Sequence, residues 1–294
     1  MRPPEAPGQP HTVRFEAIGT HWQIDSATPL GASLETLVRE RIAEFDLAYS
    51  RFRDDSLVSR LRFSAGSVRL PDDAGPLFDL YRRLYDLTGG AVTPLVGASL
   101  ERLGYDSTYR LRPDGPAVPA LAWEDAIAWD GESLTAHRPV TVDVGAAGKG
   151  YLVDIVAELL TEHGHEDVVV DAGGDMLRRG PGTIRVGLEH PSDPTRAIGV
   201  VELGTGALCA SATNRRAWGD GLHHVIDPVT GLPTTRVVAT WALAATALEA
   251  DGLATALFFA DPEYLGRQFD FQYVVVDSRG RVTYSPDLLG EMFL

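Results

Sequence analysis

The chain has 294 residues, of which 44% are hydrophobic and 23% are charged, a composition typical of a folded globular protein. Its formal net charge of −15 argues against binding to nucleic acid, because a protein that holds the phosphate backbone needs a basic face. The single cysteine, Cys209, excludes a disulfide framework and a cysteine-based zinc cluster. No apolar stretch is long enough to span a membrane, and the N-terminal segment shows neither a signal peptide nor a lipid-attachment cysteine, so the expected location is the cytoplasm.

The hydrophobic pattern predicts elements along the whole chain, after a tail, residues 1–11, that we expect to be disordered. Alternating residues predict a β-hairpin over 12–24 with Gly19 at its bend. The later expected elements are helices through 34–45, 74–87, 148–163 and 248–259, a loop over 105–119, buried strands at 167–175 and 273–277, and several strands up to 244. Strands outnumber helices without strict alternation, which favours an α+β fold. We expect a single domain over 12–294 and leave open a division into two lobes joined near 105–120.

The stretch VDVGAAGKGYLVD, Val142–Asp154, is predicted to be a strand, a glycine turn and the start of a helix. It contains Lys149, the only lysine among the 26 basic residues. The stretch fails the Walker pattern, because Asp143 and Gly150 stand where that pattern needs Gly and Ser or Thr. Free backbone N–H groups at a helix start, with a lysine beside them, would suit an anion. An ordinary turn with a solvated lysine explains the pattern equally well.

The stretch ALEADGLATAL places Asp251 and Thr255 four residues apart, and therefore on one face of the predicted helix. A carboxylate and a hydroxyl are hard oxygen donors that suit magnesium better than zinc or copper. The simpler interpretation, a surface aspartate and a buried threonine on an amphipathic helix, is favoured on this stretch alone.

The stretch LHHVIDPVTGLP contains two consecutive histidines before a strong turn sequence. Neighbouring residues of a strand face opposite ways, so only one of His223 and His224 can point into a site. A histidine that titrates near neutrality can act as a general base. The glycine turn DAGGD, Asp171–Asp175, either lines a ligand or simply reverses the chain.

The order of these motifs resembles the ApbE family, the FAD:protein FMN transferases, from about Ile18 to Phe259. The motifs that carry the resemblance are GTHW, SRFRDDSLVSRL, GGAVTPLVG, VDVGAAGKGYLVD, GGD, CASAT, HHVIDPVTG and EADGLATALF. The resemblance implies an α+β fold with mixed, largely antiparallel sheets flanked by helices. It also implies a magnesium-dependent enzyme that moves FMN from FAD to a Ser or Thr hydroxyl of an acceptor flavoprotein and releases AMP.

The resemblance further implies roles for individual residues. Asp251, Thr255 and the backbone carbonyl of Ala146 would bind Mg²⁺, and His224 would be the catalytic base. The residues that would contact FAD are Ile18, Phe52, Ala91, Val92, Thr93, Asp143, Lys149 and Ile226. The sequence departs from the family pattern at three of these or neighbouring positions: Ile18 replaces the usual Met, Thr93 an Asp found in many relatives, and Ala254 a second acid found in some.

Two alternatives remain open from the sequence. One is an FAD pyrophosphatase, in which water replaces the acceptor hydroxyl. The other is a protein that binds FAD without turnover.

Overall fold

The structure is a computed structural model that describes residues 10–293. Most of the expected tail therefore lies outside the described residues, and the first strand already begins at His11. The hairpin predicted for residues 12–24 is present as β1 and β2, with Gly19 at φ 72° in the turn. No helix within the described part of the chain is long and apolar enough to cross a membrane.

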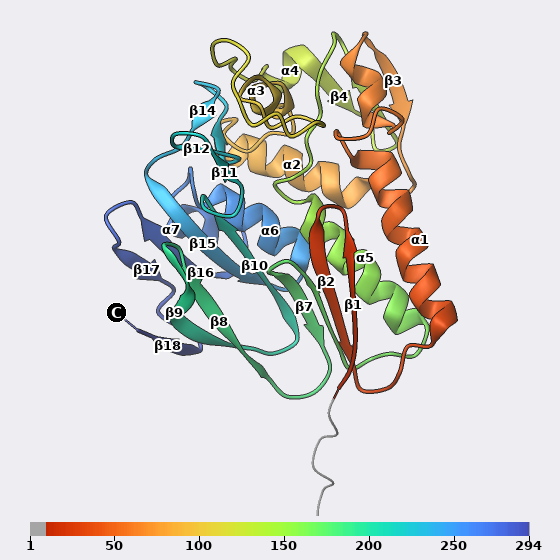
Figure 1. Cartoon of the computed structure of the whole chain (residues 1–294), viewed down its shortest axis with the longest axis vertical. Helices are drawn as coiled ribbons and strands as arrows, with labels where there is room; N and C mark the ends of the chain where they lie inside the picture. Colours follow the sequence, from red (N-terminus) through yellow and green to blue (C-terminus); the bar gives the residue numbers. More distant parts are fainter. Residues whose placement is uncertain (1–9, 294) are drawn as a thin grey trace, which may run out of the picture.

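One large sheet organises the molecule (Figure 1). Its strands, in spatial order, are β1 (His11–Ala17), β2 (Thr20–Ser26), β6 (Val168–Ala172), β7 (Asp175–Arg179), β10 (Gly206–Ala212), β15 (Val237–Ala244), β16 (Gln272–Asp277) and β17 (Val282–Tyr284). Every pair of neighbours in it is antiparallel. This confirms the α+β fold with largely antiparallel sheets.

The remaining strands form small antiparallel sheets and hairpins. The sheet beside the N-terminal helices consists of β3 (Gly66–Arg69), β5 (Ser133–Ala136) and β4 (Ile127–Trp129). A second sheet consists of β18 (Gly290–Met292), β9 (Asp193–Leu203) and β8 (Ile184–His190). Two short hairpins pair β11 (Ala217–Trp218) with β12 (Leu222–His223) and β13 (Ile226–Asp227) with β14 (Leu232–Pro233).

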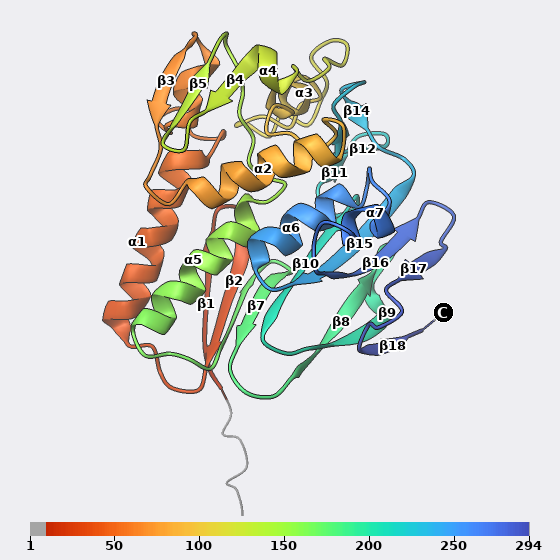
Figure 2. The same cartoon turned by 180° about the vertical axis from the view of Figure 1, so that it is seen from behind.

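The longer helices are stacked on one face of the large sheet, the face turned to the viewer in Figure 2. In chain order they are α1 (Ala32–Tyr49), the 3₁₀ turn η1 (Val58–Arg62), α2 (Gly75–Leu87), α3 (Gly97–Arg102), α4 (Trp123–Ala126), α5 (Gly148–Glu162), α6 (Ala247–Ala256) and α7 (Pro262–Gly266). Helices α5 and α6 contact the sheet directly, while α1 packs on α5 and α2 packs on α6. The sequence predicted both of these central helices, and the structure buries most of their residues.

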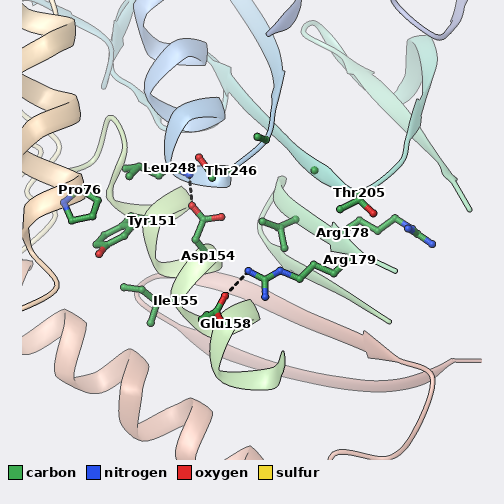
Figure 3. A pocket seen from close by; sticks show the side chains of 13 residues that line it. Pro76, Tyr151, Asp154, Ile155, Glu158, Arg178, Arg179, Thr205, Thr246 and Leu248 are labelled. Carbon is green, nitrogen blue, oxygen red and sulfur yellow. Dashed lines mark hydrogen bonds and ion pairs between the residues drawn. The ribbon is translucent and has the colours of Figure 1, made fainter. Parts of the chain in front are cut away.

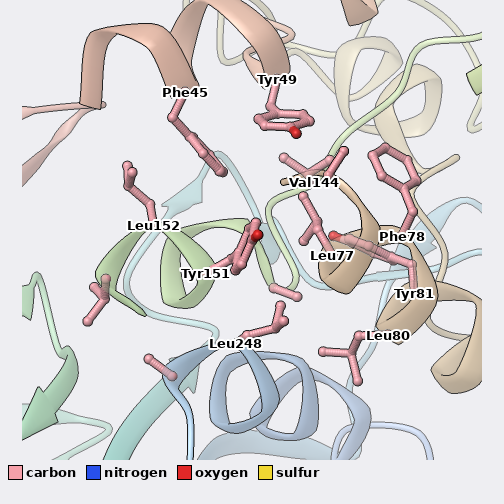
Figure 4. Packing of buried hydrophobic residues seen from close by; sticks show 14 of the residues in the cluster. Phe45, Tyr49, Leu77, Phe78, Leu80, Tyr81, Val144, Tyr151, Leu152 and Leu248 are labelled. Atoms are coloured by element: carbon pink, nitrogen blue, oxygen red, sulfur yellow. The ribbon is translucent and has the colours of Figure 1, made fainter. Parts of the chain in front are cut away.

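The main hydrophobic core fills the space between these layers. Side chains of α1, α2, α5 and α6 converge in it (Figure 4), and Phe45 of α1 meets Tyr151 of α5 with ring centroids 6.3 Å apart. The same core takes residues from before and after the loop at 105–119, such as Leu84 and Leu152. The division into two lobes stays a prediction.

Helices α5 and α6 cross so closely that one position tolerates only glycine. A Cβ atom built on Gly150 would lie 2.1 Å from the Ala247 carbonyl oxygen and 2.6 Å from Cβ of Asp251. Since both neighbours belong to the other helix, any side chain here must push α5 and α6 apart.

We therefore expect Gly150→Ala to lower the free energy of unfolding by about 1–3 kcal/mol, because overpacking outweighs the better helix propensity of alanine. Urea unfolding measures this change. The matched control is Gly75→Ala in α2, where an added Cβ meets nothing within 4 Å. A Gly150→Ala protein as stable as the parent would show that the helices have room to separate.

Candidate active site

The turn before α5 is held in place by side chains. Oδ1 of Asp143 accepts the Gly145 N–H at 2.7 Å, and its Oδ2 accepts from Nε of Arg51. The Tyr81 hydroxyl accepts the Ala146 N–H at 3.1 Å. Burial alone would raise the pKa of Asp143, but the Arg51 charge and these hydrogen bonds outweigh it and keep that pKa below its usual value.

These bonds correct one expectation from the sequence. The N–H groups of Gly145 and Ala146 are taken by side chains, and those of Ala147 and Gly148 donate to the Val144 carbonyl at 3.3 and 2.7 Å. The start of α5 therefore does not offer the row of free N–H groups that an anion cradle needs. The turn is tightly wound, so its own backbone and nearby side chains satisfy its donors.

Three oxygen donors meet beside this turn. The Thr255 hydroxyl donates to the Ala146 carbonyl at 3.2 Å, and Oδ2 of Asp251 accepts the Gly150 N–H at 2.9 Å. The three expected metal ligands are thus brought together from the turn and from α6. Asp251 is only 4% exposed, so its interpretation as a surface residue is wrong. Its neighbour Thr255 is partly exposed.

The electrostatics of Asp251 suit a cation. Burial raises the pKa of Asp251 well above its usual value, and the nearby negative charge of Asp175 adds to the shift. A carboxylate, a hydroxyl and a carbonyl are the hard donors that magnesium accepts, with water completing its shell. Within residues 10–293 no group of three or more His, Cys, Asp or Glu side chains could hold a metal, so a site here depends on this mixed set.

Lys149 points into the protein rather than into solvent. Its ammonium donates to Asp175 and, at 3.0 Å, to the Ala172 carbonyl. Burial lowers the pKa of Lys149, but the negative charges of Asp175 and Asp251 raise it by a larger amount. The net pKa lies above its usual value, so the lysine stays protonated. The solvated-lysine interpretation is therefore wrong. Asp175 is 0% exposed, and the sequence pattern around its glycine turn does not indicate that it pairs with Lys149.

The two histidines differ in their surroundings. His223 is buried, and its ring contacts the Thr234 carbonyl at 2.9 Å and the Val225 N–H at 3.3 Å. His224 is partly exposed, and its Nδ1 atom is buried without a hydrogen-bond partner among residues 10–293. Burial is the main cause that lowers the pKa of His224 to about 3, and the positive charge of Arg216 adds to it. His224 is therefore neutral at pH 7.

The remaining residues that were expected to contact FAD lie in separate parts of the structure. Phe52 and Ile226 lie in one hydrophobic cluster with Tyr105 and Trp218. The segment Ala91–Thr93 leads into Pro94, whose carbonyl accepts the Asp143 N–H at 2.8 Å. Val92 and Thr93 are buried, and within this segment only Ala91 is partly exposed.

Ile18 lies apart from these groups, in the β1–β2 turn at φ 46°, and it packs against the main core.

Sequence reasoning missed three residues of the site. Arg51 holds Asp143, and Tyr81 holds the Ala146 turn. Ala217 pairs with His223 in the antiparallel β11–β12 hairpin, so Arg216, the residue before Ala217, lies opposite His224. Helical spacing assigned Tyr81 to a helix without indicating which atoms its hydroxyl would meet. One arginine among many carries no signal of its own.

A surface pocket of about 370 Å³ lies on the other side of α5, and none of the expected site residues line it (Figure 3). Asp154 stands in its wall and accepts the N–H groups of Ala247 and Leu248, both at 2.8 Å. Burial raises the pKa of Asp154 to about 6. Its contacts fix the start of α6, which in turn sets the position of Asp251 one turn later.

Comparison with known proteins defines the class. A model of the ApbE family matches residues 18–270. The chain is 34% identical to "FAD:protein FMN transferase" of Escherichia coli (strain K12), covering 84% of this chain and 78% of that protein. It is 30% identical to the protein of the same name from Treponema pallidum (strain Nichols), covering 87% and 81%. The crystal structure of the ApbE protein from Thermotoga maritima superimposes with a TM-score of 0.82 at 23% identity, covering 95% and 97%, which establishes the shared fold. The chain belongs to the ApbE family.

The buried pair of Lys149 and Asp175 can be tested by stability. Lys149→Met should lower the free energy of unfolding by about 3–5 kcal/mol, because it leaves a buried carboxylate unpaired. Adding Asp175→Asn should recover part of that loss, since it removes the stranded charge. Urea unfolding of the single and double variants checks both values. Equal losses of unfolding free energy in the single and double variants would mean that Lys149 does not stabilise the charge of Asp175.

Proposed function

We propose that the protein is a magnesium-dependent FAD:protein FMN transferase. It moves FMN from FAD to a Ser or Thr hydroxyl of an acceptor flavoprotein and releases AMP. The names of the relatives from E. coli and T. pallidum support the activity. The observation that carries the finer proposal is the meeting of Thr255, the Ala146 carbonyl and Asp251 beside the charged Lys149. Oxygen donors next to an ammonium suit a divalent cation and a pyrophosphate together.

Lys149 meets the phosphate charge of FAD. An ammonium has three donors, and two are used by Asp175 and the Ala172 carbonyl, which leaves one for a phosphate oxygen. The two protein contacts also hold the ammonium in place, so little side-chain entropy is lost when a phosphate binds. Magnesium held by Asp251, Thr255 and the Ala146 carbonyl would supply a Lewis acid that stabilises negative charge on the phosphate oxygens.

His224 takes the proton of the acceptor hydroxyl. As that proton leaves, the hydroxyl oxygen bonds to the phosphorus of the FMN half, and the bond from this phosphorus to the AMP oxygen breaks. A neutral imidazole is the form that can accept a proton, and the low pKa keeps His224 neutral. A pyrophosphate beside the ring raises its proton affinity, since it places negative charge near a site where Arg216 disfavours the cation.

The direct test is incubation with FAD, MgCl₂ and candidate acceptor proteins. The proposal expects AMP in solution and an FMN mass increment on one Ser or Thr of the acceptor. FMN released free, with no acceptor modified, would instead identify a pyrophosphatase. Binding of FAD with no AMP released would identify a binding protein.

Asp251→Asn tests the metal site. Asparagine keeps the oxygen that accepts the Gly150 N–H but removes the charge, so the fold is retained and a ligand for Mg²⁺ is lost. We expect AMP release to fall about 100-fold or more, because a Lewis-acid metal contributes several kcal/mol to such reactions. The affinity for Mn²⁺, measured by electron paramagnetic resonance, should fall in parallel. Glu249→Gln, at a partly exposed position on the same helix, serves as the control. Unchanged Mn²⁺ binding in Asp251→Asn would remove α6 from the metal site.

His224→Asn tests the base. Loss of a general base should slow transfer about 100-fold or more while FAD binding survives. His223 cannot serve as the neutral comparison that strand alternation suggests, because its ring has two buried hydrogen bonds. His137→Asn, at an exposed position, replaces it.

The pH dependence of the reaction gives a second test of His224. A His pKa lowered in the folded protein keeps the ring neutral, and the base available, well below pH 6.5. The kcat/KM of the parent should therefore hold constant down to about pH 5.5 before any His224 limb appears. An acid limb near pH 6.5 that disappears in His224→Asn would contradict this.

A further inference from the structure

A compact loop over residues 104–112, here called the Tyr109 loop, lies against Phe52 and the β1–β2 turn. The Leu111 N–H donates to the Gly104 carbonyl at 2.8 Å and ties its two ends together. Inside the loop, Oδ1 of Asp106 accepts the N–H groups of Thr108 and Arg110 at 3.0 and 3.2 Å. The loop is therefore an internally bonded unit, although its sequence predicted only a connection.

The loop holds Tyr109 in an unusual backbone conformation. Tyr109 and Leu111 have φ values of 50° and 53°, in the left-handed region that non-glycine residues rarely occupy. Such strain persists only where surrounding contacts impose it, and it is concentrated at functional sites. The Tyr109 side chain is nevertheless 52% exposed, so burial does not account for it.

Tyr109 reaches two places that the family resemblance assigns to FAD. Its ring stacks on Phe52, with centroids 5.6 Å apart and an interplanar angle of 4°. Its hydroxyl lies 3.9 Å from the position of a Cβ built on Gly19, in the turn that carries Ile18. Tyr109 therefore reaches from Phe52 to the β1–β2 turn, although the sequence motifs assign it no role.

Phe52 offers a prepared surface. The Arg51 guanidinium lies 4.1 Å from its ring centroid, and Tyr105 meets it edge-on at 5.4 Å. Tyr105 in turn stacks on Trp218, whose indole N–H donates to the Leu103 carbonyl at 2.9 Å. Phe52 is thus braced by a row of fixed rings, whereas Tyr109 is carried by a loop at the surface.

We propose that Tyr109 is a substrate-positioning residue that stacks on a flat ring system of FAD and closes it against Phe52. The proposal rests on the proposed function, since FAD is the ligand. A ring inserted between Phe52 and Tyr109 needs faces about 3.5 Å away on each side. The Tyr109 loop must therefore move outward to admit it and then close on it.

The loop is built to keep its shape as a unit. Gly104, at φ 97°, stands at its base, and a Cβ there would lie 2.3 Å from the Arg112 backbone nitrogen, so only glycine lets the two ends of the loop approach this closely. The Asp106 bonds hold the rest of the loop together.

Fluorescence titration with FAD tests the proposal on Tyr109→Phe and Tyr109→Leu. The ring is kept in the first variant and lost in the second. We expect Tyr109→Phe to bind FAD within about two-fold of the parent and Tyr109→Leu to bind about ten-fold more weakly, the scale of one lost stacking contact. In AMP release, KM for FAD should rise while kcat is unchanged, which separates positioning from a damaged active site.

The control is Tyr284→Leu, a 40% exposed tyrosine on β17 at the edge of the large sheet. Its FAD affinity should match that of the parent, and the thermal midpoints of all variants should agree. Titrations with FMN and with AMP then identify the ring. Weaker FMN binding in Tyr109→Leu assigns the isoalloxazine, and weaker AMP binding assigns the adenine.

Two results would overturn the proposal. One is FAD affinity in Tyr109→Leu equal to that of the parent. The other is a loss in Tyr109→Phe as large as in Tyr109→Leu, which would assign the contact to the hydroxyl. A parent protein that binds no FAD would instead refute the proposed function itself.

Discussion

The close crossing of α5 and α6 at Gly150 is the constraint on which the site depends. Because no side chain separates the helices there, the Gly150 N–H can donate to Asp251 across the crossing. Asp154, one turn further along α5, accepts two N–H groups at the start of α6. Two contacts one turn apart fix both the position and the rotation of α6. Thr255 is thereby brought to the carbonyl of Ala146, and an oxygen site forms at the start of α5.

The acidic groups of the site are compensated to different degrees by neighbouring positive charges. Asp143 is paired with Arg51, and Asp175 is paired with Lys149. Asp251 is as deeply buried, but its hydrogen bond comes from a neutral backbone N–H, and its pKa is raised accordingly. Lys149 lowers the pKa of Asp251, but burial and the negative charge of Asp175 raise it by more. The divalent ion proposed above would offset this penalty at Asp251.

The sequence predicted local structure well and side-chain partners poorly. Apolar spacing is a local signal, and it correctly indicated α2, α5 and α6. The burial of Asp251 was missed because it depends on α2 and α5 covering α6 on both sides, which one helix cannot reveal. The expectation of free N–H groups at the start of α5 was wrong for a similar reason. The Tyr81 hydroxyl that accepts the Ala146 N–H lies 65 residues away in the sequence.

The hydrogen-bond partners of His223 were also missed, because strand alternation carries no information about which groups its ring would meet. The His223 ring contacts the carbonyl of Thr234, the residue that directly follows β14, the second strand of the next hairpin.

The two ends of the site are built differently. The end proposed to bind metal and phosphate rests on two long-range contacts that α6 makes with α5 and the turn before it, so its geometry does not depend on a ligand. The end that carries His224 consists of hairpins whose strands are two residues long.

These hairpins pack against the segment that follows the Tyr109 loop. The Ala120 N–H donates to the Pro228 carbonyl at 2.8 Å, and a Cβ on Gly231 would lie 2.3 Å from the Val118 carbonyl oxygen. The conformation of residues 118–120 is therefore linked to that of the β13–β14 hairpin, which begins two residues after His224.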